Sequence, residues 1–290
     1  MKTILVPIDF SKVSEYAFDL ALQMSKKAQS EIILLHIVDH PSSTTMNTMG
    51  IVDLDLDPME SIFMKKMIEL AEGKMAAKVS EAESAGANVK SKIRIGNPFL
   101  EITQQITDTK CDILVMGTEG TEGIGEELIG SNAERVIRKS KVPVITLKEK
   151  CDLGQLNKIA VASTFEDVSG EFIRHLMALQ EFLGAHLSFV KVNTPSAFQT
   201  TKSLKKQMEQ FVKDYGFKNC STEIYNDTSE EDGIVSFAED NQVDMIAMET
   251  HGRTGIMHLI LGSIAEDVAN HAKRPVWTLN VRKEKGVKES

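Results

Sequence analysis

Short, nearly continuous apolar runs alternate along this chain with longer stretches in which apolar residues recur every three to four positions. The runs at residues 4–8, 33–38 and 112–116 are typical of strands buried on both faces. The stretches between them predict amphipathic helices over about residues 14–28, 60–85 and 98–109. Such an alternation predicts an α/β fold, in which a parallel sheet is covered by helices on both faces.

The second half of the chain repeats this order of elements. Residues 4–11 match residues 159–166 at an offset of 155, whereas the strand ending at Met116 matches the strand ending at Met248 at an offset of 132. The matching helices are expected over about residues 169–183, 201–215 and 231–241. The two offsets differ by 23 residues, which we assign mainly to a loop insertion at about residues 40–58 of the first copy. A long loop of this kind fits a lid and a tolerated insertion equally well.

A glycine-rich segment follows the fourth predicted strand of each copy. In the first copy, Gly117, Gly120 and Gly130 precede Ser131, and nine residues separate Gly120 from Gly130. In the second copy, nine residues also separate Gly252 from Gly262. Glycines allow backbone N–H groups to approach an anion, and the start of the next helix favours a phosphate through its free N–H groups and dipole. Asp9, at the end of the first strand, is placed to bind a base, a ribose or a metal-bound water. Taken singly, each glycine also fits a turn or a helix cap.

Composition and charge narrow the class of protein. The 290 residues suffice for two domains, and 42% of them are apolar and 26% charged, as in soluble globular proteins. The net charge of −9 argues against a general nucleic-acid binder, and no apolar run is long enough to cross a membrane. The three cysteines form no Cys-x-x-Cys pair, so we expect reduced thiols and a cytoplasmic location.

The combined motifs resemble the universal stress protein family over nearly the whole chain, in two tandem copies. They are the opening segment at residues 4–11, the Gly-x-x-Gly-x(9)-Gly-Ser pattern that starts at Gly117, and the closing strand at residues 142–147. The resemblance implies two Rossmann-like domains of the adenine nucleotide alpha hydrolase type, each a five-stranded parallel sheet. It also implies that the last strands of the two domains pair with each other as an internal pseudo-dimer. We expect the domains at residues 1–147 and 158–281, a linker at 148–157 and a polar tail at 282–290.

Many members of the family bind ATP through the aspartate after strand 1 and the glycine loop. Carried over to the first copy, the resemblance implies a nucleotide site made of Pro7, Asp9, Ile37, Met116, Gly117, Gly120, Gly130, Ser131 and Asn132. The cofactor would be ATP or another adenine nucleotide, with or without Mg²⁺. This copy departs from the family in charge, because Glu119, Glu122, Glu126 and Glu127 crowd the loop.

The second copy departs in the opposite way. Its implied and degenerate site comprises Met248, Gly252, Arg253, Gly262, Ser263 and Ile264. Arg253 supplies a cation, but Thr164 stands in place of the aspartate and Glu249 in place of the first glycine. We therefore expect at most one competent site, in the first copy.

Our main hypothesis is a stress-linked regulatory module that binds an adenine nucleotide. The alternative is a nucleotide-free scaffold that binds protein partners through the pseudo-dimer surface, and a further homodimer is compatible with both. The sequence offers no general base or activated nucleophile, so at most slow ATP hydrolysis is expected. It has no P-loop, metal-site or nucleophile-elbow motif.

Overall fold

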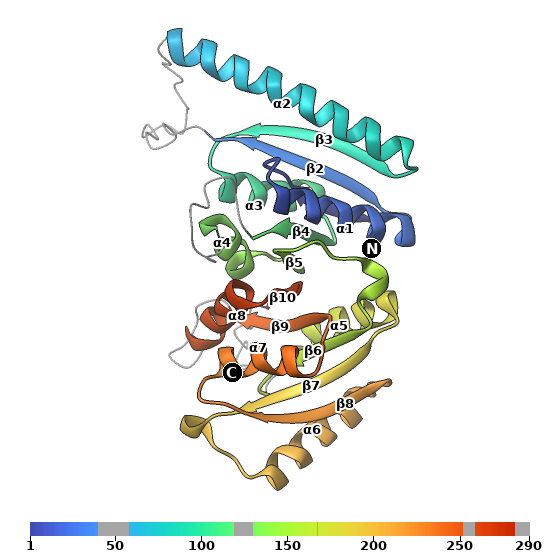
Figure 1. The fold of residues 1–290 in the computed structure, drawn as a ribbon, viewed down its shortest axis with the longest axis vertical. Helices are drawn as coiled ribbons and strands as arrows, with labels where there is room; N and C mark the ends of the chain where they lie inside the picture. Colours follow the sequence, from blue (N-terminus) through green and yellow to red (C-terminus); the bar gives the residue numbers. More distant parts are fainter. Residues whose placement is uncertain (40–57, 119–129, 167, 252–258, 282–290) are drawn as a thin grey trace, which may run out of the picture.

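The strands of this protein assemble into one ten-stranded sheet in the order β3-β2-β1-β4-β5-β10-β9-β6-β7-β8 (Figure 1). The computed structural model describes residues 1–39, 58–118, 130–166, 168–251 and 259–281. All neighbouring strands run parallel except β5 and β10, which are antiparallel. The sheet therefore consists of two parallel five-stranded halves, joined at their last strands as the resemblance implied.

The first domain contains β1 (Thr3–Pro7), α1 (Lys12–Ala28), β2 (Glu31–Val38), α2 (Pro58–Ser84), β3 (Asn88–Ile95), α3 (Pro98–Thr109), β4 (Ile113–Gly117), α4 (Ser131–Lys139) and β5 (Val144–Leu147). The second contains β6 (Lys158–Ala162), α5 (Gly170–Leu183), β7 (His186–Asn193), α6 (Thr201–Tyr215), β8 (Cys220–Asn226), α7 (Glu230–Asp240), β9 (Met245–His251), α8 (Leu259–His271) and β10 (Val276–Val281). The short helices η1 (Leu153–Gln155) and η2 (Pro195–Ala197) complete the described elements. None of the helices among these residues combines the length and the apolar character needed to cross a bilayer.

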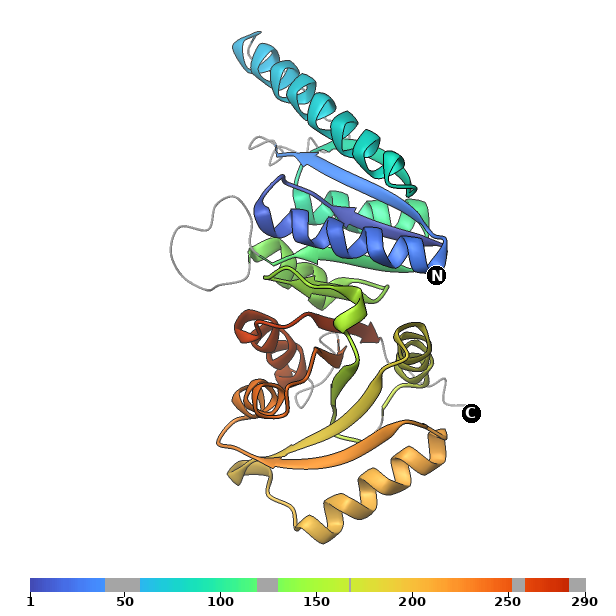
Figure 2. The same cartoon turned by 45° about the vertical axis from the view of Figure 1, so that its right-hand side comes forward.

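Two hydrophobic cores sandwich the sheet. Ile4 and Val6 of β1 point into the core beneath α1, α2, α5 and α6, whereas Leu5 points into the core beneath α3, α4, α7 and α8. The helices lie on both sides of the strands in Figures 1 and 2. The strands read as continuous apolar runs because each buries side chains on both faces. The predicted fold class is confirmed.

Local capping explains where several helices begin. The predicted bounds of α3 and α6 match the structure, but α1 begins at Lys12 rather than near residue 14. Its N-cap is Ser11, whose hydroxyl accepts a hydrogen bond from the Ser14 N–H at 3.2 Å. The predicted insertion at residues 40–58 lies outside the described residues, apart from Pro58, the first residue of α2.

The two domains are held together by more than the β5–β10 pair. Trp277 of β10 lies opposite Ile145 of β5 and is 1% exposed. On the helices above, the Arg138 guanidinium of α4 binds the Glu266 carboxylate of α8, with 2.6 Å between Nε and Oε1. The linker is tied to α1, since the Leu153 N–H donates to the side-chain oxygen of Gln23. The docked arrangement expected from the short linker is therefore present.

Candidate functional site

The chain makes a tight turn after β1, at the carboxyl edge of the sheet. Asp9 accepts a hydrogen bond from the Ser11 N–H at 2.9 Å, and Phe10 between them has a positive φ of 63°. A non-glycine residue in this region is uncommon and is held there by its surroundings. The turn places the Asp9 carboxylate directly before the N-terminus of α1.

Gly117, the last residue of β4, lies against this same helix N-terminus. A Cβ built at Gly117 would stand 2.8 Å from Val13 Cγ1, 2.9 Å from the Val13 carbonyl carbon and 3.0 Å from the Ser14 nitrogen. Because two of these atoms belong to the backbone, no side chain can be accommodated without moving α1. Glycine is thus required here by the close approach of β4 to α1.

The start of α4 comes back to the end of β4. The Gly130 N–H donates to the Thr118 carbonyl at 2.7 Å, and Gly130 is the N-cap of α4. The backbone N–H groups of Ser131 and Asn132, in the first turn of α4, have no partner within a regular helix. An N-terminus of this kind favours a bound anion.

The remaining residues implied for the first site lie around the same edge. Pro7 ends β1, and Ile37 and Met116 belong to the core beneath α3 and α4. Asn132 lies half-buried in α4. The structure therefore brings together Pro7, Asp9, Ile37, Met116, Gly117, Gly130 and Asn132, with the backbone of Ser131. Gly120 and the four loop glutamates lie outside the described residues.

The second domain keeps the turn but loses its charge. Thr164 occupies the position of Asp9, and its hydroxyl accepts from the Glu166 N–H at 3.4 Å. Phe165 has a φ of 59°, as its counterpart Phe10 does. Threonine thus supports the same backbone turn without presenting a carboxylate to a ligand.

The N-terminus of α5 is remodelled around Glu249. At the offset of 155, Ser169 corresponds to Ser14, yet Ser169 is the N-cap of α5, whereas Ser11 caps α1. The helix therefore begins three residues later in the second domain. Glu249 is 7% exposed, and its Oε1 accepts a hydrogen bond from the Ser169 N–H at 3.3 Å. The later start of α5 leaves room for this side chain, and its carboxylate lies at the N-terminus of the helix.

The start of α8 also differs from that of α4. Gly262 and Ser263 correspond to Gly130 and Ser131, but α8 begins at Leu259, so both residues lie inside the helix. The free N–H groups in the first turn of α8 are therefore those of residues 259–261, which precede Gly262 and Ser263. The expectation that Gly130 and Ser131 open the next helix holds. In the second copy the corresponding Gly262 and Ser263 lie within the helix. Gly252 and Arg253 lie outside the described residues.

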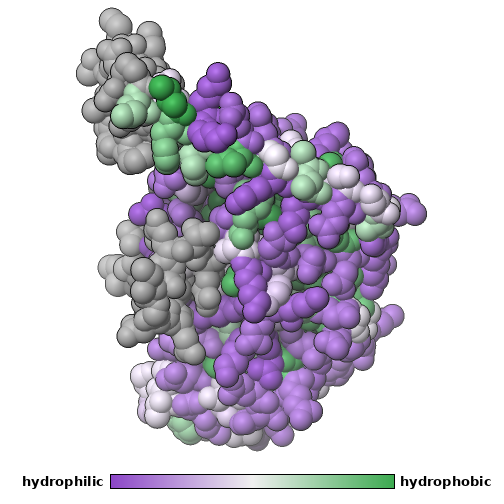
Figure 3. Space-filling view, turned by 45° about the horizontal axis from the view of Figure 1, so that its top comes forward, coloured by the Kyte–Doolittle hydropathy of each residue, from purple (hydrophilic) through white to green (hydrophobic). Residues whose placement is uncertain are grey.

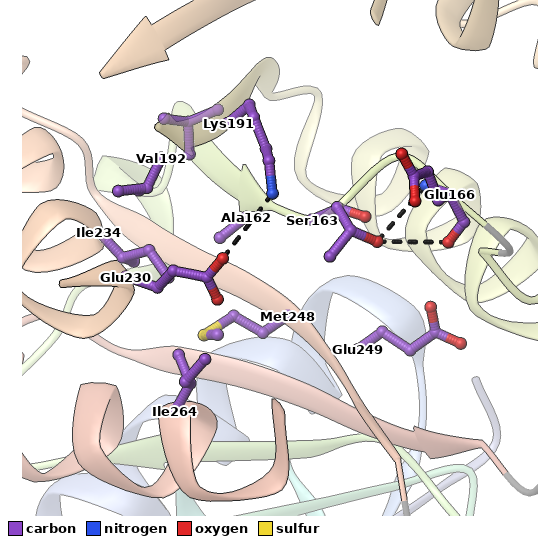
Figure 4. Close-up of a pocket in the computed structure, with 12 residues that line it drawn as sticks. Ala162, Ser163, Glu166, Lys191, Val192, Glu230, Ile234, Met248, Glu249 and Ile264 are labelled. Atoms are coloured by element: carbon purple, nitrogen blue, oxygen red, sulfur yellow. Dashed lines mark hydrogen bonds and ion pairs between the residues drawn. The ribbon is translucent and has the colours of Figure 1, made fainter. Parts of the chain in front are cut away.

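A pocket of the second domain occupies the place of the implied nucleotide site (Figure 4). Its water-accessible volume is about 40 Å³. Among the described residues its lining is mainly apolar and also carries carboxylates and one ammonium group. The lining residues are Ala162, Ser163, Thr164, Glu166, Val190, Lys191, Val192, Glu230, Ile234, Met248, Glu249 and Ile264.

Charge in this lining disfavours a phosphate. Among the described residues the lining holds three carboxylates, those of Glu166, Glu230 and Glu249. It holds one ammonium, that of Lys191, which lies 3.8 Å from Glu230 Oε1. Figure 4 shows the Lys191 side chain extending toward Glu230. Two carboxylates in excess would repel an anion, at a cost on the order of 1 kcal/mol for each close contact in water and several at an effective dielectric near 20.

The sequence analysis missed Lys191, Glu166 and Glu230 as members of this pocket. Lys191 is 8% exposed in the middle of β7. All the residues around it, from Leu187 to Asn193, are buried as well. A lysine inside an apolar run was the available signal, because a buried lysine is rare without a partner. Glu230 could not be found in this way, since it reads as an ordinary acidic first turn of α7.

Thiol chemistry has no support near either site. Burial raises the pKa of the Cys111 thiol to about 11, and burial with the charges of Asp152 and Asp244 does the same for Cys151. Burial also raises the pKa of Cys220. The thiolate is the reactive form, so these cysteines stay protonated at neutral pH.

Comparison with known proteins decides the family. The model of the universal stress protein family matches residues 1–148 and again residues 155–280. The chain belongs to the universal stress protein family. Two consecutive matches agree with the internal repeat and with the two joined halves of the sheet.

Relatives of this universal stress protein occur in single-copy and tandem forms. A universal stress protein of Methanocaldococcus jannaschii is 34% identical over 155 residues, which are 51% of this chain and 96% of that protein. One from Synechocystis is 23% identical over 294 residues, covering 96% of this chain and 99% of its own length. The crystal structure of a universal stress protein from Archaeoglobus fulgidus has a TM-score of 0.72 at 23% identity and covers 96% of both chains. This last likeness supports the fold.

Proposed function

We propose that the first domain binds an adenine nucleotide, and that the second domain does not hold the phosphates. The observation that carries this proposal is the contrast between Gly117 and Glu249. At Gly117, the end of β4 touches the N-terminus of α1 beside Asp9, with the N-terminus of α4 one residue beyond. At Glu249, a carboxylate lies at the N-terminus of α5 instead.

The residues of the first domain fit such a ligand. Ile37 and Met116 supply apolar surface for a base, and the Asp9 carboxylate can accept hydrogen bonds from ribose hydroxyls. The N–H groups at the start of α4 can receive a phosphate. The resemblance to the family implies that these same residues bind the nucleotide. The resemblance and the geometry therefore support the same site, in the first domain. We propose a regulatory role without efficient turnover, acting in a stress response in the cytoplasm.

Calorimetric titration of the full chain with ATP, with and without Mg²⁺, tests this function. Asp9→Asn keeps an acceptor for the Ser11 N–H but removes the charge, and we expect it to weaken binding at least about tenfold, as loss of a charged hydrogen bond does. Thr164→Ala is the matched change in the second domain and should leave the affinity unchanged.

A second pair of variants addresses the helix N-terminus. Gly130→Leu puts a side chain beside the first N–H groups of α4 and should abolish binding, whereas Gly262→Leu at the matching position of α8 should not. No heat and no thermal shift at millimolar nucleotide would contradict the proposal and favour the nucleotide-free scaffold. Loss of binding in Arg253→Glu alone would place the site in the second domain.

A further inference from the structure

Three polar side chains of the second domain form a hydrogen-bonded chain at the amino edge of the sheet, opposite the edge that carries the pocket of Figure 4. His186 is the first residue of β7, and its Nε2 atom lies 3.2 Å from the hydroxyl oxygen of Ser221 in β8. Its Nδ1 atom lies 3.2 Å from the side-chain oxygen of Asn219. These partners are 33 and 35 residues away from His186, so the sequence alone does not show the cluster. A serine, a histidine and a group that orients the histidine are the parts of an activated nucleophile.

The surroundings of Asn219 decide which atoms of this chain donate. Its side-chain N–H donates to the Ala185 carbonyl at 3.2 Å, so its side-chain oxygen is the atom turned toward His186. That oxygen only accepts, and the hydrogen of the neutral imidazole therefore lies on Nδ1. Nε2 then carries no hydrogen and accepts from the Ser221 hydroxyl. The imidazole is thus oriented to take up the proton of Ser221 as a general base.

Asn219 is itself held in place by its backbone. Its φ is 50°, in a region that asparagine enters more readily than most residues do. Its backbone carbonyl accepts hydrogen bonds from the Leu187 N–H at 3.1 Å and from the Gln180 side chain at 3.3 Å. Because these contacts fix the backbone of Asn219, its side-chain oxygen stays aligned with the histidine.

The first domain fills the same positions with an ordinary ion pair. Glu31 corresponds to His186 at the offset of 155, and the registers of the two strand pairs make Lys90 the counterpart of Ser221. The Lys90 ammonium lies 2.6 Å from the Glu31 carboxylate. This end of the first domain faces the reader in Figure 3, where the surface is largely hydrophilic apart from apolar atoms over α2. A side-chain contact between these two strands therefore requires neither a histidine nor a serine.

We propose that Ser221 is a nucleophile that accepts acyl groups from small, activated carboxylic esters, with His186 as its general base and Asn219 as a positioning residue. The Ser221 oxygen forms a bond to the carbonyl carbon while its proton passes to His186 Nε2. The bond from that carbon to the ester oxygen then breaks, and the proton passes from Nε2 to the leaving alcohol. Water hydrolyses the acyl-serine by the same route and releases the carboxylic acid.

The open edge of β8 gives this step a hydrogen-bond donor and access for the ester. β8 is the outermost strand at its end of the described sheet (Figure 1). The Leu187 N–H bonds to the Asn219 carbonyl, so alternate residues from there on, Ser221 included, turn their backbone groups toward β7. The next residue, Thr222, turns its N–H outward, where it can donate to the acyl oxygen as negative charge develops. Ser221 and His186 are half-buried, so a small ester reaches the hydroxyl from solvent.

Acetylation of the full chain by p-nitrophenyl acetate, quenched in acid and followed by peptide mass spectrometry, tests the nucleophile. We expect Ser221 to be acetylated at least about a hundredfold faster than Ser203, an exposed serine of α6 in the same domain. His186→Gln removes the general base and should slow the acetylation of Ser221 by a similar factor. Asn219→Gly suits the positive φ but removes the orienting oxygen, and should slow it at least about tenfold. Asn219→Asp keeps an oxygen for Nδ1 and should restore most of the rate.

A double exchange separates the nucleophile from the structural contact. His186→Glu combined with Ser221→Lys installs the ion pair of the first domain, so the chain should unfold at a similar urea concentration to the unchanged chain. Its release of p-nitrophenol should fall to the level of Ser221→Ala. Acetylation of Ser221 no faster than that of Ser203, or a rate that His186→Gln leaves unchanged, overturns the proposal. So does release of p-nitrophenol by the double exchange at the rate of the unchanged chain.

Discussion

The two domains share a fold and a glycine spacing, yet their helices begin at different places around the equivalent edge. In the first domain, β4 ends in Gly117 against α1, and α4 begins directly after Gly130. In the second, α5 begins three residues later and α8 four residues earlier than their counterparts. Equal spacing of glycines therefore does not ensure equal geometry. Glu249 places a side chain where Gly117 contacts α1 in the first domain, and α5 begins three residues later than α1 does.

Exchanging the residues at this contact should have the largest effect. Gly117→Glu forces a Cβ to within 3 Å of the backbone of α1, so we expect the free energy of unfolding to fall by about 3 kcal/mol, as in overpacked cores. The reverse change, Glu249→Gly, relieves no clash. It removes the carboxylate from the N-terminus of α5 and adds backbone entropy to the unfolded chain, so it should cost about 2 kcal/mol. Urea unfolding measures both. If both variants lost the same free energy of unfolding, the backbone contact at Gly117 would not be the reason why glycine is required there.

The joint between the domains is also asymmetric. Glu266 of α8 binds Arg138 of α4, whereas the positions related by the repeat are Glu134 and Asn270. The hydrogen bond and charge of Glu266 raise the pKa of Arg138, in agreement with a formed ion pair. The contact therefore occurs once in the pseudo-dimer rather than twice.

Neutralising one member of this pair should have the next largest effect. Glu266→Gln leaves Arg138 without its charged acceptor in a largely buried place, and we expect a loss of about 2 kcal/mol. Glu134→Gln at the repeat-related position should change stability by less than about 0.5 kcal/mol. Thermal unfolding followed by calorimetry compares them. A larger loss for Glu134→Gln would mean that the other side of the joint carries the stability.

The carboxylate at the start of α5 provides a smaller test. Glu249→Gln keeps the shape and removes the charge beside the Ser169 N–H, so we expect a loss of about 1 kcal/mol at low salt and less at high salt. Glu171→Gln, in the first turn of the same helix but more exposed, should lose less. If the two variants lose the same amount, the burial of Glu249 adds nothing to the general effect of charge at a helix N-terminus.

The sequence predicted the fold well because its signals were local and repeated. Apolar runs indicated the strands, and apolar residues every three to four positions indicated the helices between them. The structure shows N-caps at Asn97 for α3 and Thr200 for α6, both residue types that favour a helix start. The site was less predictable. The later start of α5 accompanies a contact between Glu249 and Ser169, which are 80 residues apart in the chain. Lys191 and Glu230 meet only when β7 and α7 are packed together.

The two domains also differ on the buried side of α1 and α5. His175 of α5 corresponds to Leu20 of α1, which is fully buried. Burial lowers the pKa of His175, and the charge of Arg174 acts in the same direction, against the opposite effects of Glu171 and Asp112. The unfolded chain therefore binds a proton at this histidine more readily than the folded chain does.

Stability should consequently fall as the pH drops below about 6.5, where the unfolded histidine becomes protonated first. His175→Leu, which installs the residue of the first domain, removes this contribution, and its stability should decline less between pH 7.5 and pH 5.5 than that of the unchanged chain. Denaturant unfolding at several pH values measures the difference. At pH 7.5 both states carry a neutral histidine, so any offset there reports packing alone. Parallel stability curves over the whole range would show that the burial of His175 is not coupled to folding.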